Sequence, residues 1–272
     1  MNSPLEEAAR LMMELNYDEA IELLKTDTSP KGCHMLATCY FLTGEFEKTY
    51  KTFKQLREIT SEAQYLKDAE KFIGVFEGGE FHHSLPQPNQ KDYPQSIERS
   101  DESYEELDIL KKFQNIEDLV DYLNKRIGYK NYEKSANAMF CLGQIAVNNG
   151  SIEKGLEYYF KAISKNPNKA LYFGYYAQFL YRQQQHAFET ARFCDQAIKL
   201  DPQNARWHYI KGLNLASAAV SMRNNVFLLS GLKNCEKALE LCRSDQVSFK
   251  KAIQTACRSI EDGISASGIK SS

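Results

Sequence analysis

The sequence predicts an all-α protein, and three observations support that prediction. Proline and glycine, which interrupt helices, number only 7 and 14 among 272 residues. Apolar residues recur three and four positions apart along much of the chain, which is the spacing of one face of an α-helix. The third observation is an internal repeat of about 35 residues, marked by Pro167 and Pro202, and a repeat of this length is typical of stacked helix pairs.

The clearest repeat runs from 136 to 169. Small residues at Gly143 and Gly155 predict two antiparallel helices that approach closely. Gly150 is expected to end the first helix, and Pro167 to separate this unit from the next, because proline cannot continue a helix. The side chains expected to fill the space between the two helices are Leu142, Ile152 and Tyr159.

The same order of residues recurs in 171–204. Its last residues read QAIKLDP, against KAISKNP at the end of the preceding unit. A third unit opens at Ala205 with Gly212 at the small position, and it contains an insertion around Met222 to Val226 before its second helix.

With this pattern, the sequence resembles the tetratricopeptide repeat family over 136–204, and less closely over 205–242. Parts of the pattern also recur in 30–63 and 4–26, although Thr49 and Thr190 replace the usual alanine. The resemblance implies a right-handed solenoid of antiparallel helix pairs, with about five to six repeats. It also implies a final capping helix, and the stripe Ile253, Cys257 and Ile260 is suited to that role.

The sequence divides into four segments. Degenerate repeat helices are expected over 1–76, an acidic flexible linker or loop over 77–101, the main solenoid with its capping helix over 102–265, and a frayed tail over 266–272. Residues 77–108 contain nine acidic and two basic residues, a net charge of −7. Two interpretations stay open: a solvated tether, or an acidic segment that docks on a basic partner or on the solenoid.

Charge and cysteine usage narrow the function classes. The formal charge of −2, with no clustered basic surface, favours neither nucleic acid nor an anionic membrane as a partner. No apolar run reaches the length of a membrane span, and no basic segment leads into an apolar run as in a secretory signal. The seven cysteines form no close pairs, so we expect reduced, buried thiols and a cytoplasmic location.

No motif for catalysis stands out. Phosphate-binding glycine loops and zinc-protease signatures are missing, and His82-His83 is the only histidine cluster. It predicts at most a weak metal site, because no third ligand stands at a suitable spacing. We therefore expect no catalytic residues, no metal, no cofactor and no small-molecule substrate.

The resemblance implies that the first helix of each repeat lines a concave groove. Aromatic, amide and arginine side chains in such a groove suit a protein segment with apolar and polar contacts. The alternative is that some of the aromatic side chains pack between adjacent repeats. The ten predicted groove residues are Asn137, Phe140, Gln144, Asn148, Tyr172, Tyr175, Phe179, Arg182, Arg206 and Tyr209.

Two binding functions follow from this groove. The first is a non-catalytic scaffold or adaptor, a subunit of an intracellular complex. The second is a chaperone or co-chaperone for client proteins. Some co-chaperones of this family grip a terminal carboxylate with lysine, asparagine and arginine side chains, but only Arg206 keeps a suitable charge here. The five positions compared are Cys141, Ile145, Gly174, Arg206 and Ile210.

Overall fold

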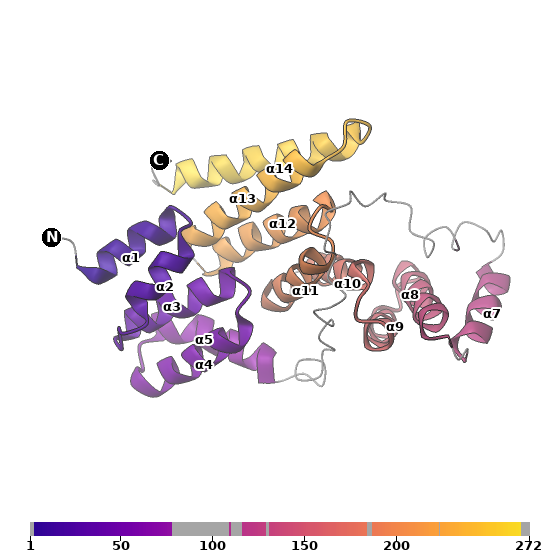
Figure 1. Cartoon of the computed structure of the whole chain (residues 1–272), viewed down its shortest axis with the longest axis horizontal. Helices are drawn as coiled ribbons and strands as arrows, with labels where there is room; N and C mark the ends of the chain where they lie inside the picture. The colour runs from indigo at the N-terminus through magenta and orange to yellow at the C-terminus, as the bar shows by residue number, and fades with distance from the viewer. Residues whose placement is uncertain are drawn as a thin grey trace.

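The computed structural model describes residues 3–77, 109, 116–128, 131–183, 187–222 and 224–267. Within these ranges the chain forms α-helices joined by short turns and contains no β-strand (Figure 1). Most of the helices are arranged as antiparallel pairs that stack on one another. The predicted all-α repeat fold is therefore confirmed.

The N-terminal helices begin where the sequence places capping residues. Ser3 accepts a hydrogen bond from the Glu6 backbone N–H at 3.2 Å, and the Glu6 carboxylate accepts one from the Ser3 N–H at 2.8 Å. Ser29 accepts one from the Gly32 N–H at 3.1 Å, and a proline follows each of these caps. The five helices are α1 (Pro4–Met13), α2 (Tyr17–Leu24), α3 (Pro30–Leu42), α4 (Phe46–Ile59) and α5 (Ala63–Glu77).

The central and C-terminal helices include three successive pairs. α8 packs on α9, α10 on α11, and α12 on α13. Gly150 lies just beyond α8 with a φ of 78°, so it ends that helix in the left-handed conformation, as predicted. The helices are α7 (Ile116–Ile127), α8 (Tyr132–Asn148), α9 (Ile152–Lys165), α10 (Ala170–Gln183), α11 (Ala187–Leu200), α12 (Ala205–Met222), α13 (Asn225–Leu241) and α14 (Val247–Ala266).

Glycines bring the paired helices together. A Cβ atom on Gly143 would lie 3.2 Å from the Gly155 carbonyl oxygen, and one on Gly212 would lie 2.8 Å from that of Gly231. The backbones are too close at these points for larger side chains. This confirms the close approach predicted for Gly143 and Gly155. The third pair approaches closely in the same way at Gly212 and Gly231.

The predicted insertion around Met222 to Val226 is absorbed into longer helices. α12 has 18 residues and α13 has 17, whereas α10 and α11 have 14 each. The turn between α12 and α13 is short, and Asn224 caps α13 by accepting a hydrogen bond from the Val226 N–H at 3.1 Å. The insertion therefore extends the third pair beyond the ends of its neighbour.

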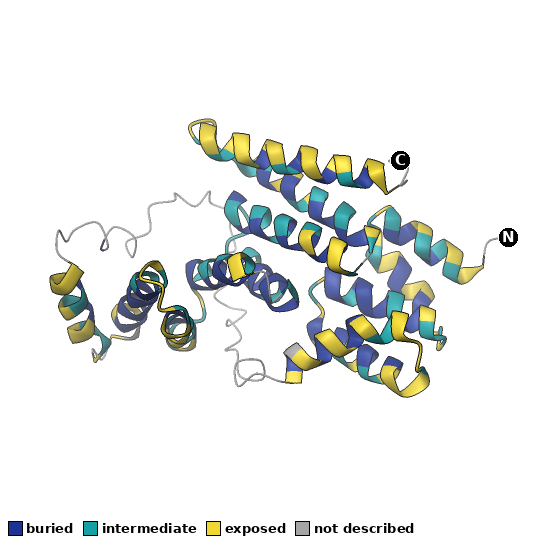
Figure 2. Ribbon diagram, turned by 180° about the vertical axis from the view of Figure 1, so that it is seen from behind, coloured by how far each residue is buried: buried dark blue, intermediate teal, exposed yellow. Residues whose placement is uncertain are grey.

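α14 covers the last pair, as a capping helix must in a solenoid. One stripe of α14 is buried against α13, and the opposite side is exposed to solvent (Figure 2). The buried residues are Ile253, Cys257, Ile260 and Ile264.

The N-terminal helices pack beside the last repeats. α1 contacts α13 and α5 contacts α11, while α7 to α9 extend from the other side of α10 (Figure 1). Phe41 lies at the centre of this junction with 3% of its surface exposed. Its ring centroid lies 4.9 Å from that of Phe188 in α11 and 5.7 Å from that of Phe227 in α13. Residues 3–77 thus share a hydrophobic core with α11 to α13. The division of the chain at 77–101 stays a prediction, because 78–108 lies outside the described residues.

The junction also buries an ionisable group. Glu189 in α11 is buried, and this burial raises the pKa of its carboxyl from 4.5 to about 7, opposed by the nearby charge of Arg192. The Arg192 guanidinium lies 5.6 Å from the centre of the Phe76 ring in α5. Burial lowers the pKa of Arg192, while Glu47 in α4 and Glu189 oppose that change. A carboxylate in this setting costs stability when it is ionised.

We expect Glu189→Gln to change the pH dependence of stability. The carboxyl binds its proton more tightly in the folded chain than in the unfolded one. Its favourable contribution is complete below pH 4.5 and is lost as the pH rises through about 7. At pH 8 the variant should gain about 1–3 kcal/mol in the free energy of unfolding, and at pH 4 it should gain nothing. Urea titrations at both pH values measure this change in the free energy of unfolding.

Glu153→Gln, at an exposed site on α9, is the control. An equal pH response in both variants would contradict the assignment of the pH dependence to Glu189.

Candidate partner-binding face

The centre of the predicted groove is a contact between α10 and α12. Arg206 Nη1 donates a hydrogen bond to the Tyr175 hydroxyl at 3.3 Å, and the guanidinium lies 5.9 Å from the centre of the Tyr175 ring. Both side chains are half-buried, so each keeps some surface for a ligand. An arginine against an aromatic ring gains cation–π attraction and stays ordered in one place.

Neighbouring aromatic rings fix the position of Tyr175. Its ring lies edge-on to Phe140 of α8, with centroids 5.4 Å apart, and edge-on to Trp207 of α12 at 6.1 Å. The Trp207 ring in turn lies against the bare backbone of Gly174, where a Cβ atom would come within 2.3 Å of it. The sequence thus places glycine where the indole needs room. As a result, three successive first helices hold Tyr175 in a defined orientation.

Four of the predicted groove residues are buried instead, namely Asn137 and three aromatic residues. Phe140 and Tyr172 are 0% exposed and Phe179 is 5% exposed. The rings of Phe140 and Tyr172 pack together, with centroids 5.2 Å apart, and the Tyr172 hydroxyl donates a hydrogen bond to Asn137 Oδ1. The prediction that these three aromatic residues line an open groove is therefore wrong. The alternative interpretation, packing between adjacent repeats, describes them correctly.

The other predicted residues occupy varied surroundings. Asn148 and Arg182 are exposed at the ends of α8 and α10, and Gln144 is half-buried in α8. Tyr209 is half-buried as well, but its ring lies edge-on to Phe249 of α14 at 5.4 Å. Tyr209 thus belongs to the contact between α12 and the capping helix. Binding by the accessible members of the set stays a prediction.

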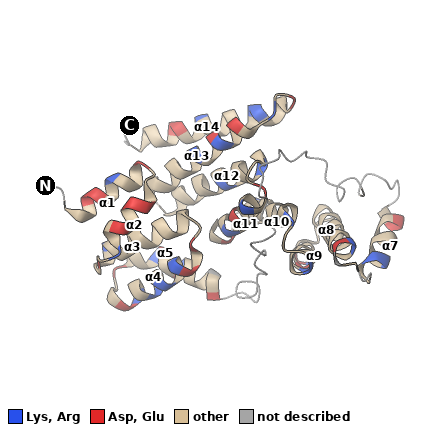
Figure 3. Ribbon diagram, viewed as in Figure 1, with Lys and Arg blue, Asp and Glu red and all other residues tan. Residues whose placement is uncertain are grey.

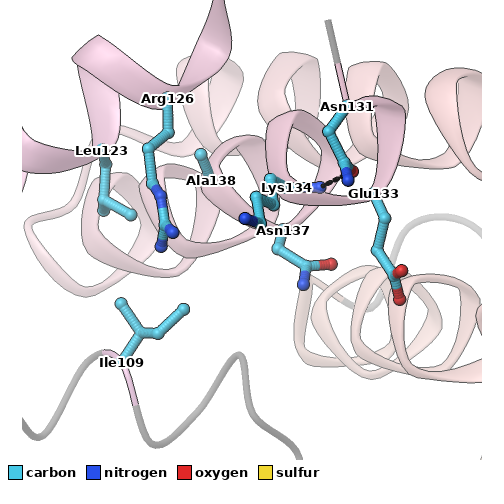
Figure 4. A pocket seen from close by; sticks show the side chains of 8 residues that line it. All are labelled: Ile109, Leu123, Arg126, Asn131, Glu133, Lys134, Asn137 and Ala138. Carbon is cyan, nitrogen blue, oxygen red and sulfur yellow. Dashed lines mark hydrogen bonds between the residues drawn. The ribbon is translucent and has the colours of Figure 1, made fainter. Parts of the chain in front are cut away.

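Asn137 lines a small pocket between α7 and α8. Figure 4 shows the pocket, which has a volume of about 110 Å³. Arg126 and Leu123 reach into it from α7, and Asn131 caps α8 on the other side by accepting a hydrogen bond from the Lys134 N–H at 3.1 Å. The pocket is too small for more than a side chain or a few waters.

Two glutamines at equivalent positions have unpaired polar atoms. Gln144 and Gln178 each follow the small residue of their repeat, and the buried Gln144 Nε2 and Gln178 Oε1 find no hydrogen-bond partner among the described residues. Buried groups of this kind cost free energy until they are paired. Gln178 is missing from the predicted set, and a strict offset of 34 residues from Gln144 would have found it.

Three of the five positions that would grip a terminal carboxylate are closed. Cys141 and Ile210 are buried, and Gly174 lies under the Trp207 ring. Ile145 is half-buried and uncharged, so Arg206 is the one accessible position with a suitable charge. This arrangement supports the inference from the sequence that these residues do not hold a chaperone tail.

The cysteines are free thiols. Six are buried and Cys242 is half-buried. Burial raises the pKa of Cys39 and of Cys235 to about 12, which keeps these thiols protonated and unreactive. No group of three potential metal ligands occurs among the residues that the structure describes, and His82-His83 lies outside them.

Charged side chains of both signs are mixed over the surface. Both α1 and α14 carry lysine or arginine as well as aspartate or glutamate (Figure 3). In the described part of the chain, no helix is long and apolar enough to span a membrane.

A second, larger cavity lies where the N-terminal helices meet the α12–α13 turn. It has a volume of about 670 Å³, and α3 and α5 form one wall while Met222, Asn224, Asn225 and Val226 line the other. Sequence reasoning missed this site. The only available signal was the insertion in the third repeat, which supplies the second wall.

The comparisons with known proteins concern the fold. No family model matches the sequence, and no curated protein matches it significantly. Among solved structures, the TPR2AB domain of yeast Sti1 in complex with pHSP90 is 15% identical, with a TM-score of 0.40, over 95% of this chain and 97% of that chain. Yeast Tom70 is 15% identical, with a TM-score of 0.38, over 94% of this chain and 67% of that one. The C-terminal part of a TPR repeat-containing protein from Cytophaga hutchinsonii is 13% identical, with a TM-score of 0.38, over 96% and 94%.

The chain has an all-α helical-repeat fold. The assignment rests on the stacked helix pairs, on their close approach at glycine, and on the capping helix. The chain departs from a simple linear array, because its first five helices pack against its last repeats.

Proposed function

We propose that this protein is a non-catalytic scaffold or adaptor that binds a segment of a partner protein. The face centred on Tyr175 and Arg206 is the binding surface. One observation supports this above the others: the two side chains are held together by their mutual contact and by packed rings, yet both remain accessible. Ordered aromatic and arginine side chains lose little entropy on binding, and such residues dominate the energetics of protein interfaces.

The chemistry of this face indicates the kind of segment that it binds. Arg206 and the exposed Arg182 provide guanidinium donors for carboxylate or carbonyl oxygens. Gln144 and Gln178 add amide groups whose buried atoms lack partners among the described residues. A helix or extended segment with an apolar side chain over Tyr175 and an acidic side chain toward Arg206 would suit the tyrosine ring and the guanidinium donors of this face.

We also propose that the protein is a subunit of an intracellular complex in the cytoplasm. Free, buried cysteines are typical of a reducing compartment, and they support this location. A client-binding chaperone is the competing function. It predicts many weakly bound partners, whereas the scaffold predicts one partner at a fixed stoichiometry.

Tyr175→Ala combined with Arg206→Ala tests the binding face. Affinity purification with crosslinking mass spectrometry first identifies the crosslinked partner. The double variant should then bind the purified partner about 30-fold to 150-fold more weakly, a loss of about 2–3 kcal/mol, because both groups leave the surface together. Isothermal titration calorimetry measures this change, and circular dichroism checks that the helices are retained.

The matched control is Tyr158→Ala combined with Lys161→Ala on α9. The Lys161 Nζ lies 5.9 Å from the centre of the Tyr158 ring, so this is also a tyrosine with a cation. The pair lies on α9, which is the second helix of its repeat and not one of the predicted groove helices. The control should bind the partner as the wild type does. If the α9 variant loses affinity and the Tyr175 and Arg206 variant does not, the binding face is elsewhere.

A further inference from the structure

We propose that the cavity between the N-terminal helices and the α12–α13 turn binds an arginine side chain of a partner protein. This would be a second binding site, separate from the face around Tyr175. The cavity is formed by two distant parts of the chain, and its volume of about 670 Å³ lies within the range of ligand sites.

A buried carboxylate is the main polar group of this cavity. Asp68 in α5 is only 7% exposed, and its Oδ2 lies 3.3 Å from His34 Nε2 in α3. The imidazole is charged only when it is protonated, so it is a weak counter-ion for the carboxylate. The second oxygen, Oδ1, has no hydrogen-bond partner within the described ranges. An acceptor in this position favours a ligand that brings both a positive charge and N–H donors.

Aromatic rings pack against His34, the hydrogen-bond partner of the Asp68 carboxylate. The His34 ring lies between Phe53 and Tyr65, with centroids 6.1 Å and 5.7 Å away. Gln64 and Tyr65 stand four and three residues before Asp68 on α5, so the three side chains share one face of that helix. The carboxylate, the amide and the tyrosine ring therefore line the same wall.

The opposite wall adds polar and apolar contacts. Asn224 and Asn225 offer amide oxygens, and Met222 and Val226 offer apolar surface.

This combination selects a guanidinium group over other cations. A guanidinium has five N–H donors in a plane, which suit one carboxylate oxygen together with several amide oxygens. Its plane can also stack on the Tyr65 ring. Lys67 also lines the cavity, but it is exposed, and water screens its charge. The apolar surface at Met222 and Val226 suits an aliphatic residue next to the arginine. We therefore assign the site to a polypeptide and not to a free small molecule.

Three blocked probes test the proposal by NMR titration of the full-length protein. They are the peptide acetyl-Leu-Arg-Ala-amide, the same peptide with citrulline in place of arginine, and N-acetyl-arginine amide. Citrulline has nearly the shape of arginine but no charge. The arginine peptide should shift resonances of α5 and of the α12–α13 turn. It should bind at least tenfold more tightly than the citrulline peptide. It should also bind at least about threefold more tightly than N-acetyl-arginine amide.

Substitutions in the chain test which residues contact the arginine peptide. Asp68→Asn should weaken binding of the arginine peptide at least tenfold. Asn225→Ala, at an exposed position, should weaken it about threefold with no effect on folding, so the test stands even if Asp68→Asn is unstable. Asp121→Asn, at an exposed site on α7, and Arg206→Ala should both leave it unchanged.

Several results would overturn the proposal. They are equal binding of the arginine and citrulline peptides, no shift with any probe, or unchanged binding in both the Asp68 and Asn225 variants. If N-acetyl-arginine amide and the arginine peptide bound with equal affinity, the assignment of the site to a polypeptide would be overturned. Because Arg206→Ala is among the controls, failure at this cavity is distinguishable from failure of the Tyr175 face.

Discussion

Phe41→Ala is expected to lower the free energy of unfolding by about 3–5 kcal/mol and to loosen the N-terminal helices from α11 to α13. The Phe41 ring contacts four other rings, and two of them, Phe188 and Phe227, belong to the other side of the junction. Truncation to alanine would leave a cavity in the core that the N-terminal helices share with α11 to α13. Urea unfolding measures the loss of stability. Hydrogen exchange measures the loosening, as faster exchange in α11 and α13.

Phe249→Ala is the matched control for this prediction. Phe249 is a half-buried phenylalanine of α14 that packs in a different hydrophobic cluster from Phe41, and its ring contacts Tyr209. Its loss should cost less stability and should leave exchange in α11 unchanged. If Phe41→Ala destabilised the protein but did not alter exchange in α11 and α13, the shared core would be contradicted.

Gly174→Ala is expected to cost about 2–4 kcal/mol, although it adds a single methyl group. The new Cβ would lie 2.3 Å from Trp207 Cζ3 and 2.5 Å from Cη2. The indole is buried and cannot move aside without disturbing Tyr175. The melting temperature and the near-ultraviolet circular dichroism of this single tryptophan report the displacement.

The same substitution at Gly74 gives the opposite expectation. Gly74 lies in α5, and an added Cβ there would meet no atom within 4 Å. Alanine favours the helix over glycine by about 1 kcal/mol, so Gly74→Ala should stabilise the protein by up to that amount. Equal effects at the two glycines would show that helix propensity, and not the contact with Trp207, determines the result at Gly174.

The sequence predicted the helix pairs well because their signals are local. The small residues Gly143 and Gly155, the turn at Gly150 and the apolar stripe of the capping helix each act within one or two helices. The groove was predicted less well. Relative to the first unit, Tyr172, Tyr175 and Phe179 stand one residue beyond the strict offset of 34, and one residue turns a helix position by about 100°. For Phe179, the rotation is from the half-buried position of Gln178 to a position that is 5% exposed.

The position of the N-terminal helices could not be predicted from the sequence. Phe41, Phe188 and Phe227 each read as an ordinary apolar position on one face of a helix. Nothing in the local period indicates that they meet. The cavity around Asp68 was missed for the same reason, because its two walls are more than 150 residues apart in the chain.

The shared core around Phe41 also imposes an order on biosynthesis. The ribosome produces the chain from its N-terminus, so Phe41 and Phe72 emerge long before Phe188 and Phe227. At about 5–20 residues per second, the interval is on the order of ten seconds or more. During that time the first five helices expose aromatic surface that only the end of the chain can cover. The nascent chain is thus open to aggregation in this interval, and truncation before α13 leaves the surface uncovered.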